Sequence, residues 1–156
     1  SKSATSLFKK YSVLSSRELK ARAEVLYENY ATRLEIEART LLTMVRTEIL
    51  PATLRYQAEI ADVIGSTQVV GVDCPETEQT LQEIVDLAAG MKNGVSTLDA
   101  ILEKVPSEPA KHAQYMHDRA LTVMQGIREA CDSAEEILPM ELWPLASYAQ
   151  MLLSGR

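Results

Sequence analysis

Residues 15–64 read SSRELKARAEVLYENYATRLEIEARTLLTMVRTEILPATLRYQAEIADVI, and hydrophobic side chains recur in this segment at every third or fourth position. From Tyr27 to Val63 ten such steps cover 36 residues, an average of 3.6, which is the period of an α-helix. Ser15 and Glu18 have the spacing of a capping box, in which the two side chains bind free amides at a helix start. The sequence therefore predicts one amphipathic helix over about residues 16–64.

Pro51 lies inside this predicted helix. Proline lacks an amide hydrogen, and its ring clashes with the carbonyl four residues earlier. The hydrophobic phase continues unchanged past Pro51, so we expect a kink rather than a reversal of the chain. Gly65 has the residue type that commonly follows a helix end, which predicts a loop over 65–73.

Two more helices are predicted, over about 75–105 and 108–137, with a turn at Pro106–Pro109 between them. Their similar lengths and short connection indicate an antiparallel hairpin. Gly90 and Gly94 suggest a close approach between helices. The expected fold is all-α: a long kinked first helix packed with this hairpin as a three-helix bundle, a flexible lead-in at 1–14, and a tail at 138–156 with a short helix near its end.

The composition excludes several classes of protein. The chain has 156 residues, a net charge of -6, six glycines and six prolines, which is unlike collagen or a flexible linker. An acidic chain is a poor ligand for nucleic acid or an anionic membrane, and no apolar run approaches the roughly 20 residues that span a bilayer. Two cysteines do not form a disulfide framework, so we expect a cytoplasmic protein.

A search for catalytic chemistry finds no complete site. His112 and His117 are five residues apart, which turns them about 140° from each other on a helix. Neither has the glutamate three positions earlier that di-metal bundles use, and Cys74 and Cys131 lack partner zinc ligands. We therefore expect no catalytic, cofactor-binding or metal-binding residue in this chain, with His117 at the edge of an apolar seam.

The first helix is longer than the hairpin that packs on it. A hairpin of about 28 residues per helix can cover only the region from near Ile36 to Ile64. An amphipathic helix face without a partner is a candidate interaction surface. We hypothesise that residues 17–35 bind something outside this chain, through the stripe of Leu19, Ala23, Leu26, Tyr27, Tyr30 and Leu34.

Several short motifs resemble the C-terminal region of type III glutamine synthetases. In that family a helix with an internal Ile-Leu-Pro-Ala segment precedes a helical hairpin and a closing Trp-Pro with a nearby Tyr. The matching positions here are the IEART segment at 36–40, Pro51 in ILPA, Arg128-Glu129-Ala130, and Trp143, Pro144 and Tyr148 in the tail. The resemblance covers about residues 14–153.

The resemblance implies that this chain is part of an enzyme that joins ammonia to glutamate with ATP and a divalent metal, Mg or Mn. That family forms a double-ring dodecamer, and its ligand-binding residues lie upstream of this region. The implied role is packing on the catalytic core of the same polypeptide and subunit assembly, with Trp143 and Tyr148 as further interface candidates; an ordinary core role for Trp143 is equally open. The alternative is an autonomous cytoplasmic helical interaction or scaffold module.

Overall fold

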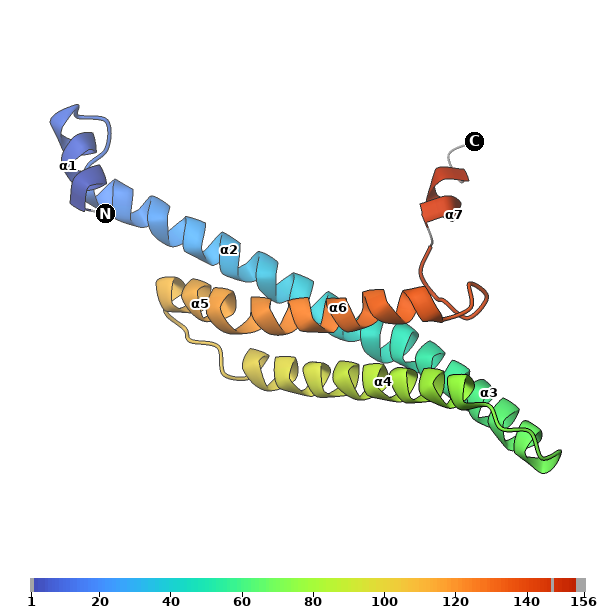
Figure 1. The fold of residues 1–156 in the computed structure, drawn as a ribbon. Coiled ribbons are helices and arrows are strands. Elements are labelled where there is room, and N and C mark those ends of the chain that lie inside the picture. The colour runs from blue at the N-terminus through green and yellow to red at the C-terminus, as the bar shows by residue number, and fades with distance from the viewer. Residues whose placement is uncertain (1, 147, 154–156) are drawn as a thin grey trace.

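The computed structural model describes residues 2–146 and 148–153, and helices dominate these ranges (Figure 1). No strand occurs within them, which confirms the predicted all-α fold. In chain order the elements are α1 (Lys2–Lys10), α2 (Ser16–Met44), η1 (Val45–Ile49), α3 (Leu50–Val69), α4 (Pro75–Leu102), α5 (Pro109–Tyr115), η2 (Met116–Ala120), α6 (Leu121–Ile137) and α7 (Tyr148–Leu153).

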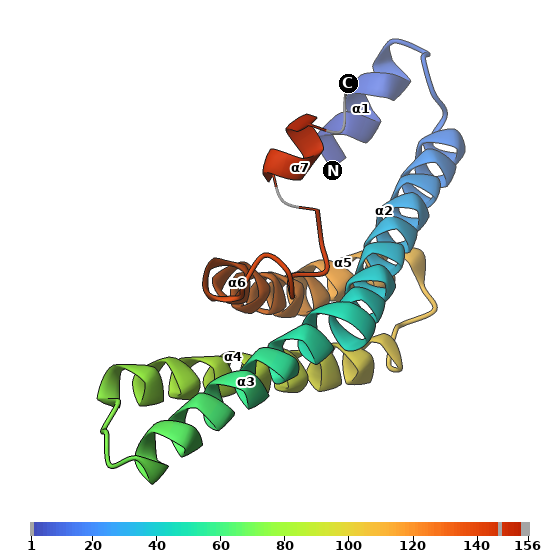
Figure 2. The ribbon, with the colours of Figure 1, turned by 90° about the vertical axis from the view of Figure 1, so that its right-hand side faces the viewer.

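The first long helix is continuous through α2, η1 and α3. It begins with the predicted capping box: the Glu18 amide donates to Ser15 Oγ at 3.2 Å, and the Ser15 amide donates to Glu18 Oε2 at 2.8 Å. η1 is a π-helical turn, in which the Leu50 amide donates to the Val45 carbonyl five residues back. This wider turn directly precedes Pro51, and Figure 2 shows the helix changing direction there without reversing.

Two boundaries differ from the prediction. α3 passes through Gly65 and ends at Val69, because the residue that leaves the helix in a left-handed conformation is Gly71, with φ of 77°. The hydroxyls of Ser66 and Thr67 donate to carbonyls one turn earlier, which is consistent with continued helix at this point. The lead-in predicted over 1–14 contains a helix, α1.

α4 packs antiparallel to the third long helix, which is continuous through α5, η2 and α6 (Figure 1). η2 is a second π-helical turn, closed by the Leu121 amide and the Met116 carbonyl. A Cβ atom added to Gly94 would lie 2.5 Å from Ile127 Cγ1, so the predicted close approach is confirmed at Gly94. The prediction for Gly90 is wrong, because nothing lies within 4 Å of such an atom there.

The hydrophobic core lies where the three long helices meet. Its fully buried large side chains include Met91, Leu98, Met116 and Ile127. A smaller cluster of Ile60, Ile64 and Ile84 joins the far end of α3 to the start of α4. The hairpin and the first helix therefore share one bundle, as predicted.

The tail turns back after α6. The amides of Leu142 and Trp143 both donate to the Pro139 carbonyl, at 2.9 and 3.1 Å, and the half-buried Trp143 and Leu145 pack against the main core cluster. α7 follows, beyond residue 147, which lies outside the described residues. The contacts of Trp143 favour the core interpretation of this side chain over an exposed interface.

Candidate functional site

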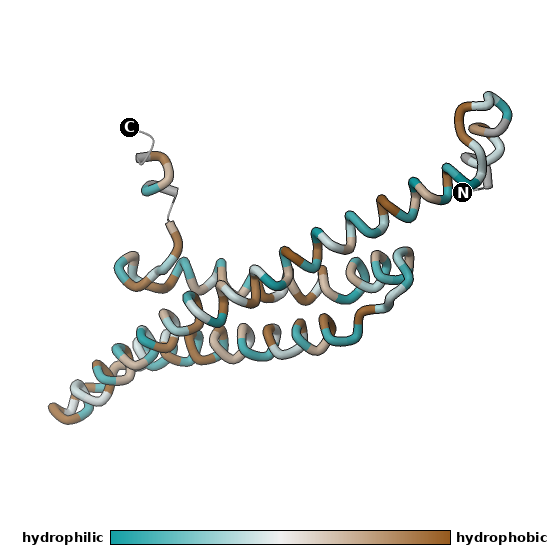
Figure 3. The backbone as a smooth tube through the Cα atoms, turned by 180° about the vertical axis from the view of Figure 1, so that it is seen from behind, coloured by the Kyte–Doolittle hydropathy of each residue, from teal (hydrophilic) through white to brown (hydrophobic). Residues whose placement is uncertain are grey.

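Burial along α2 changes at Ala31. Ala31 itself is fully buried, whereas Leu26, Tyr27 and Tyr30 are 68, 45 and 40% exposed. We call residues 16–30 the projecting segment and residues 31–69, which continue through η1 and α3, the covered segment. Figure 3 shows apolar and polar residues still alternating along the projecting segment, so it keeps its amphipathic pattern.

The predicted extent of the uncovered stripe is therefore too long at one end. Leu34 is only 6% exposed and belongs to the main core cluster, so the prediction that it lacks a partner within the chain is wrong. The physical reason is that α5 packs on α2 and reaches further along it than α4 does (Figure 1). The hairpin consequently covers the first helix as far as Ala31 rather than Ile36.

Beside this boundary lies an open apolar hollow of about 500 Å³, which we call the α2–α5 groove. Leu26, Tyr27 and Tyr30 line one wall, and the other wall comes from α5 and η2 through Ala110, Ala113, Gln114 and His117. The second set is spaced by three, one and three residues, so it lies on one face of the third helix. No lysine, arginine, aspartate or glutamate is among the lining residues.

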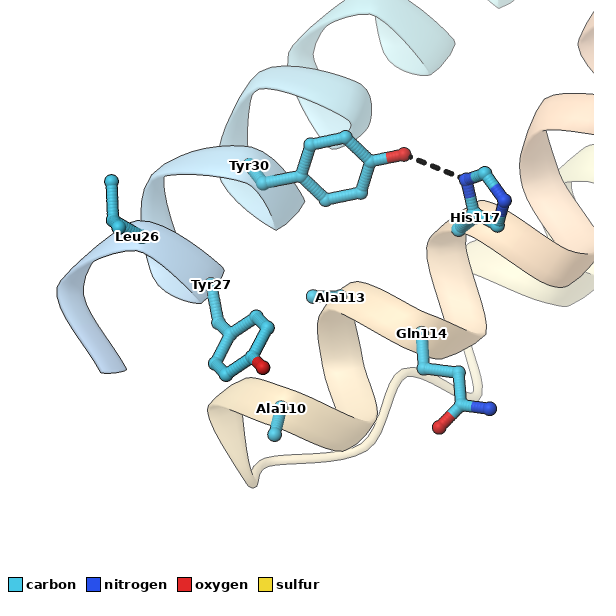
Figure 4. A pocket seen from close by; sticks show the side chains of 7 residues that line it. All are labelled: Leu26, Tyr27, Tyr30, Ala110, Ala113, Gln114 and His117. Carbon is cyan, nitrogen blue, oxygen red and sulfur yellow. Dashed lines mark hydrogen bonds between the residues drawn. The ribbon is translucent and has the colours of Figure 1, made fainter. Parts of the chain in front are cut away.

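The two walls are joined by one hydrogen bond. Tyr30 Oη lies 2.9 Å from His117 Nδ1, and the two rings are 6.3 Å apart between centroids and tilted by 45°. Figure 4 shows Tyr30 reaching across to His117, while Tyr27 lies over Ala110. The small Ala113 side chain is buried and lets α2 and α5 approach at the floor of the groove. His117 is thus a partnered histidine at the edge of an apolar seam, as predicted.

The structure brings together only some of the predicted interface residues. Leu26, Tyr27 and Tyr30 share the groove, whereas Leu19 and Ala23 are half-buried nearer the start of α2. The side chain of Tyr148 lies outside the described part of the chain. Whether any of these positions forms an interface stays a prediction.

Sequence reasoning missed the second wall of the groove. The period of the third helix places Ala113 and His117 on apolar seams, but it does not say that these positions face Tyr27 and Tyr30. The signal that could have found them is the pair of small residues Ala110 and Ala113, three apart, because small side chains permit close approach of helices.

A second hollow, of about 650 Å³, lies between α2 and α6. Its apolar side chains are Leu41, Leu121 and Met124, and charged residues surround them, among them Glu37, Glu129 and Asp132. This hollow is more polar at its edge than the α2–α5 groove.

Neither cysteine lines either hollow. Cys131 is buried in the core, and burial raises the pKa of its thiol to about 11, so it stays protonated at neutral pH. Both cysteines are free, and Cys74 Sγ lies 3.2 Å from the Thr67 hydroxyl. Within residues 2–146 and 148–153, no three potential metal ligands lie together. The described helices include none of the length and hydrophobicity that crossing a membrane requires.

The family model and the relatives that match this chain all describe glutamine synthetases. The family model described as "Glutamine synthetase C-terminal domain" matches residues 1–68. A type-3 glutamine synthetase from Dictyostelium discoideum is 27% identical over 154 residues, covering 94% of this chain and 21% of the relative. A glutamine synthetase from Butyrivibrio fibrisolvens is 25% identical over 154 residues, covering 96% of this chain and 22% of the relative.

The chain spans about a fifth of the length of these curated relatives. No solved structure matches it significantly. The alignments nevertheless extend over nearly the whole chain, well beyond the 68 residues that the family model covers. They confirm the resemblance predicted from the sequence motifs, and residues 1–68 are similar to the glutamine synthetase C-terminal domain.

Proposed function

We propose that this chain is the non-catalytic C-terminal helical domain of a glutamine synthetase, which packs on the catalytic core of the same polypeptide and supports subunit assembly. The parent activity would be the ATP-dependent ligation of ammonia to glutamate. The family match over residues 1–68 and the alignments with glutamine synthetases over nearly the whole chain support this proposal. In the parent, ATP and Mg or Mn would bind outside this chain.

The α2–α5 groove is the observation that carries the packing role. Leu26, Tyr27 and Tyr30 expose large apolar surface on a helix that buries the corresponding face over the covered segment. Burying a fully exposed large apolar side chain is worth about 1.5–3 kcal/mol, and a partner that covered the exposed parts of these three would gain a fraction of that amount for each. Packing on the catalytic core of the same polypeptide would bury this apolar surface.

The remaining parts of the proposal follow from the family. The parent would work in the cytoplasm as a homo-oligomer, the dodecamer that the resemblance implies, with neither nucleic acid nor membrane as a partner. The net charge of -6 supports the last two points, because nucleic acids and anionic membranes attract basic surfaces.

The test uses the whole reading frame that contains this chain. Its purified product is expected to form glutamine from glutamate, ammonia and ATP with Mg²⁺ or Mn²⁺, and the 156-residue chain alone is expected to form none. A reading frame that starts near Ser1, or turnover by the 156-residue chain, would overturn the proposal. The first of these results would instead support an autonomous helical interaction module.

A further inference from the structure

We propose that the α2–α5 groove receives an apolar segment of the same polypeptide that precedes residue 1. This inference rests on the proposed function, because it assigns the contact between the helical domain and the rest of the enzyme to one surface.

The chemistry of the groove selects an apolar occupant. Its two walls carry aromatic, aliphatic and alanine side chains, and its hydrogen-bonding side chains are those of the two tyrosines, Gln114 and His117. Tyr30 and His117 already bind each other, so they offer little to a charged ligand. A helix or loop that presents aliphatic or aromatic side chains would fill the hollow of about 500 Å³ and bury Tyr27.

The chain that is expected to precede residue 1 is the source of this occupant, and the length of the relatives supports its existence. The matched region is about a fifth of each relative, so about four-fifths of each relative lies outside the match. Because the matching family model describes a C-terminal domain, most of that remaining length is expected to precede the domain. A segment of this part is joined covalently to α1, which gives it a high effective concentration at nearby surfaces.

The position of α1 favours the same segment over a second copy. α1 contacts α2 and is separated from it by the five residues 11–15, and Figure 1 shows α2 and α5 diverging toward the end of α2 that follows α1. A segment joined to α1 is therefore tethered near the projecting segment, whereas a second copy has no such tether.

Photo-crosslinking within the whole polypeptide tests the proposal. Tyr27 is replaced by benzoylphenylalanine, and the same group placed at Val63 serves as a control, because Val63 is 53% exposed on the covered segment. A mixture of ¹⁴N- and ¹⁵N-labelled copies separates crosslinks within one chain from those between chains. The expected product joins position 27 to a peptide that precedes residue 1 in the same copy, and position 63 does not yield it.

Three results would overturn the inference: a crosslink from position 27 to a second copy, a crosslink only within residues 1–156, or no crosslink at all. The glutamine assay is run on the same preparations. If the polypeptide forms glutamine but position 27 gives one of these results, the docking inference fails while the proposed function stands. If the reading frame encodes no preceding enzyme region, the proposed function fails first.

Hydrogen exchange gives a second, independent readout. In the whole polypeptide, Leu26→Asp is expected to speed amide exchange in residues 17–30 at least tenfold, because a buried carboxylate would expel the docked segment. Val63→Asp is the matched control and is expected to leave these residues unchanged. Equal exchange in Leu26→Asp and the unsubstituted polypeptide would contradict docking at this groove.

Discussion

The projecting and covered segments belong to one continuous helix, with one hydrophobic period, and yet they differ in what surrounds them. In the covered segment, Leu42 and Val45 are buried against the hairpin. In the projecting segment, Leu26 and Tyr27 occupy the equivalent stripe and remain exposed. An amphipathic period thus indicates which face of a helix is adapted to contact, and it does not indicate whether the partner lies in the same chain.

Replacing one leucine in each segment by alanine should give the largest difference in stability between the covered and projecting segments. Leu42→Ala is expected to lower the free energy of unfolding of this chain by about 2–5 kcal/mol, because it opens a cavity in the core. Leu26→Ala is expected to change it by less than about 0.5 kcal/mol, because that side chain is 68% exposed. Urea denaturation followed by circular dichroism measures both. Similar losses in the two variants would show that the projecting segment is also packed in solution.

Two glycines of α4, in the hairpin that packs on the covered segment, should respond oppositely to substitution by alanine. Gly94→Ala is expected to destabilise the chain by about 1–3 kcal/mol, since its Cβ would meet Ile127, whereas Gly90→Ala is expected to stabilise it by up to about 1 kcal/mol. Amide exchange should speed up in residues 31–64 of the Gly94 variant and remain unchanged in residues 19–30. A destabilised Gly90 variant would contradict the open space seen at that position.

The capping box should act on the projecting segment alone. Ser15→Ala is expected to weaken the first turns of α2 by about 1 kcal/mol, because the Glu18 amide loses its acceptor. Amide exchange at residues 18–24 measures this effect, and Ser16→Ala serves as a control. Loss of protection in the covered segment would mean that the two segments unfold as one unit.

The same box makes the first turn of α2 sensitive to acid. The hydrogen bonds from the side chain and backbone of Ser15 hold the pKa of Glu18 below its ordinary value of 4.5. A carboxylate with a lowered folded pKa contributes stability that is fully present above its unfolded pKa. This contribution is expected to disappear as the pH falls below 4.5 and passes through the lowered pKa. Exchange at residues 18–24, corrected for intrinsic rates, should show the change in the parent chain and a smaller change in Ser15→Ala, which keeps the backbone amide that donates to Glu18.

A small loss of stability is expected from removing the hydrogen bond at the boundary between the two segments. Tyr30→Phe removes the hydrogen bond to His117, which is exposed, so the expected loss is only about 0.5 kcal/mol. Tyr27→Phe is the matched control, since no hydrogen bond joins the Tyr27 hydroxyl to a described residue of the groove. A double-mutant cycle with His117→Ala should give a coupling energy of the same size. A coupling near zero would show that the two walls are not joined in solution.

Much of the fold could be predicted because its determinants are local. The capping box at Ser15 depends on two side chains three residues apart, and the helix period depends on neighbours three and four residues apart. The resemblance to glutamine synthetases likewise rested on short motifs around Pro51 and Trp143. These features do not require knowledge of how one helix sits on another.

The extent of the covered segment could not be predicted, because tertiary packing sets it. How far α5 reaches along α2 depends on the crossing of the two helices and on small residues such as Ala31 and Ala113. Glycines show the same limit: Gly90 and Gly94 are equivalent in the sequence, and only the position of Ile127 distinguishes them. The second wall of the α2–α5 groove was missed for this reason.

The π-helical turn η1 holds one more residue than an ordinary α-helical turn. A single residue removed between Val45 and Ile49 is expected to convert this turn into ordinary α-helix. Because about five residues of π-helix turn the chain as far as about four residues of α-helix, the faces of α2 and α3 would keep nearly the same relative direction. Leu26, Tyr27 and Tyr30 would still face α5, so the first helix is expected to tolerate a deletion at this turn.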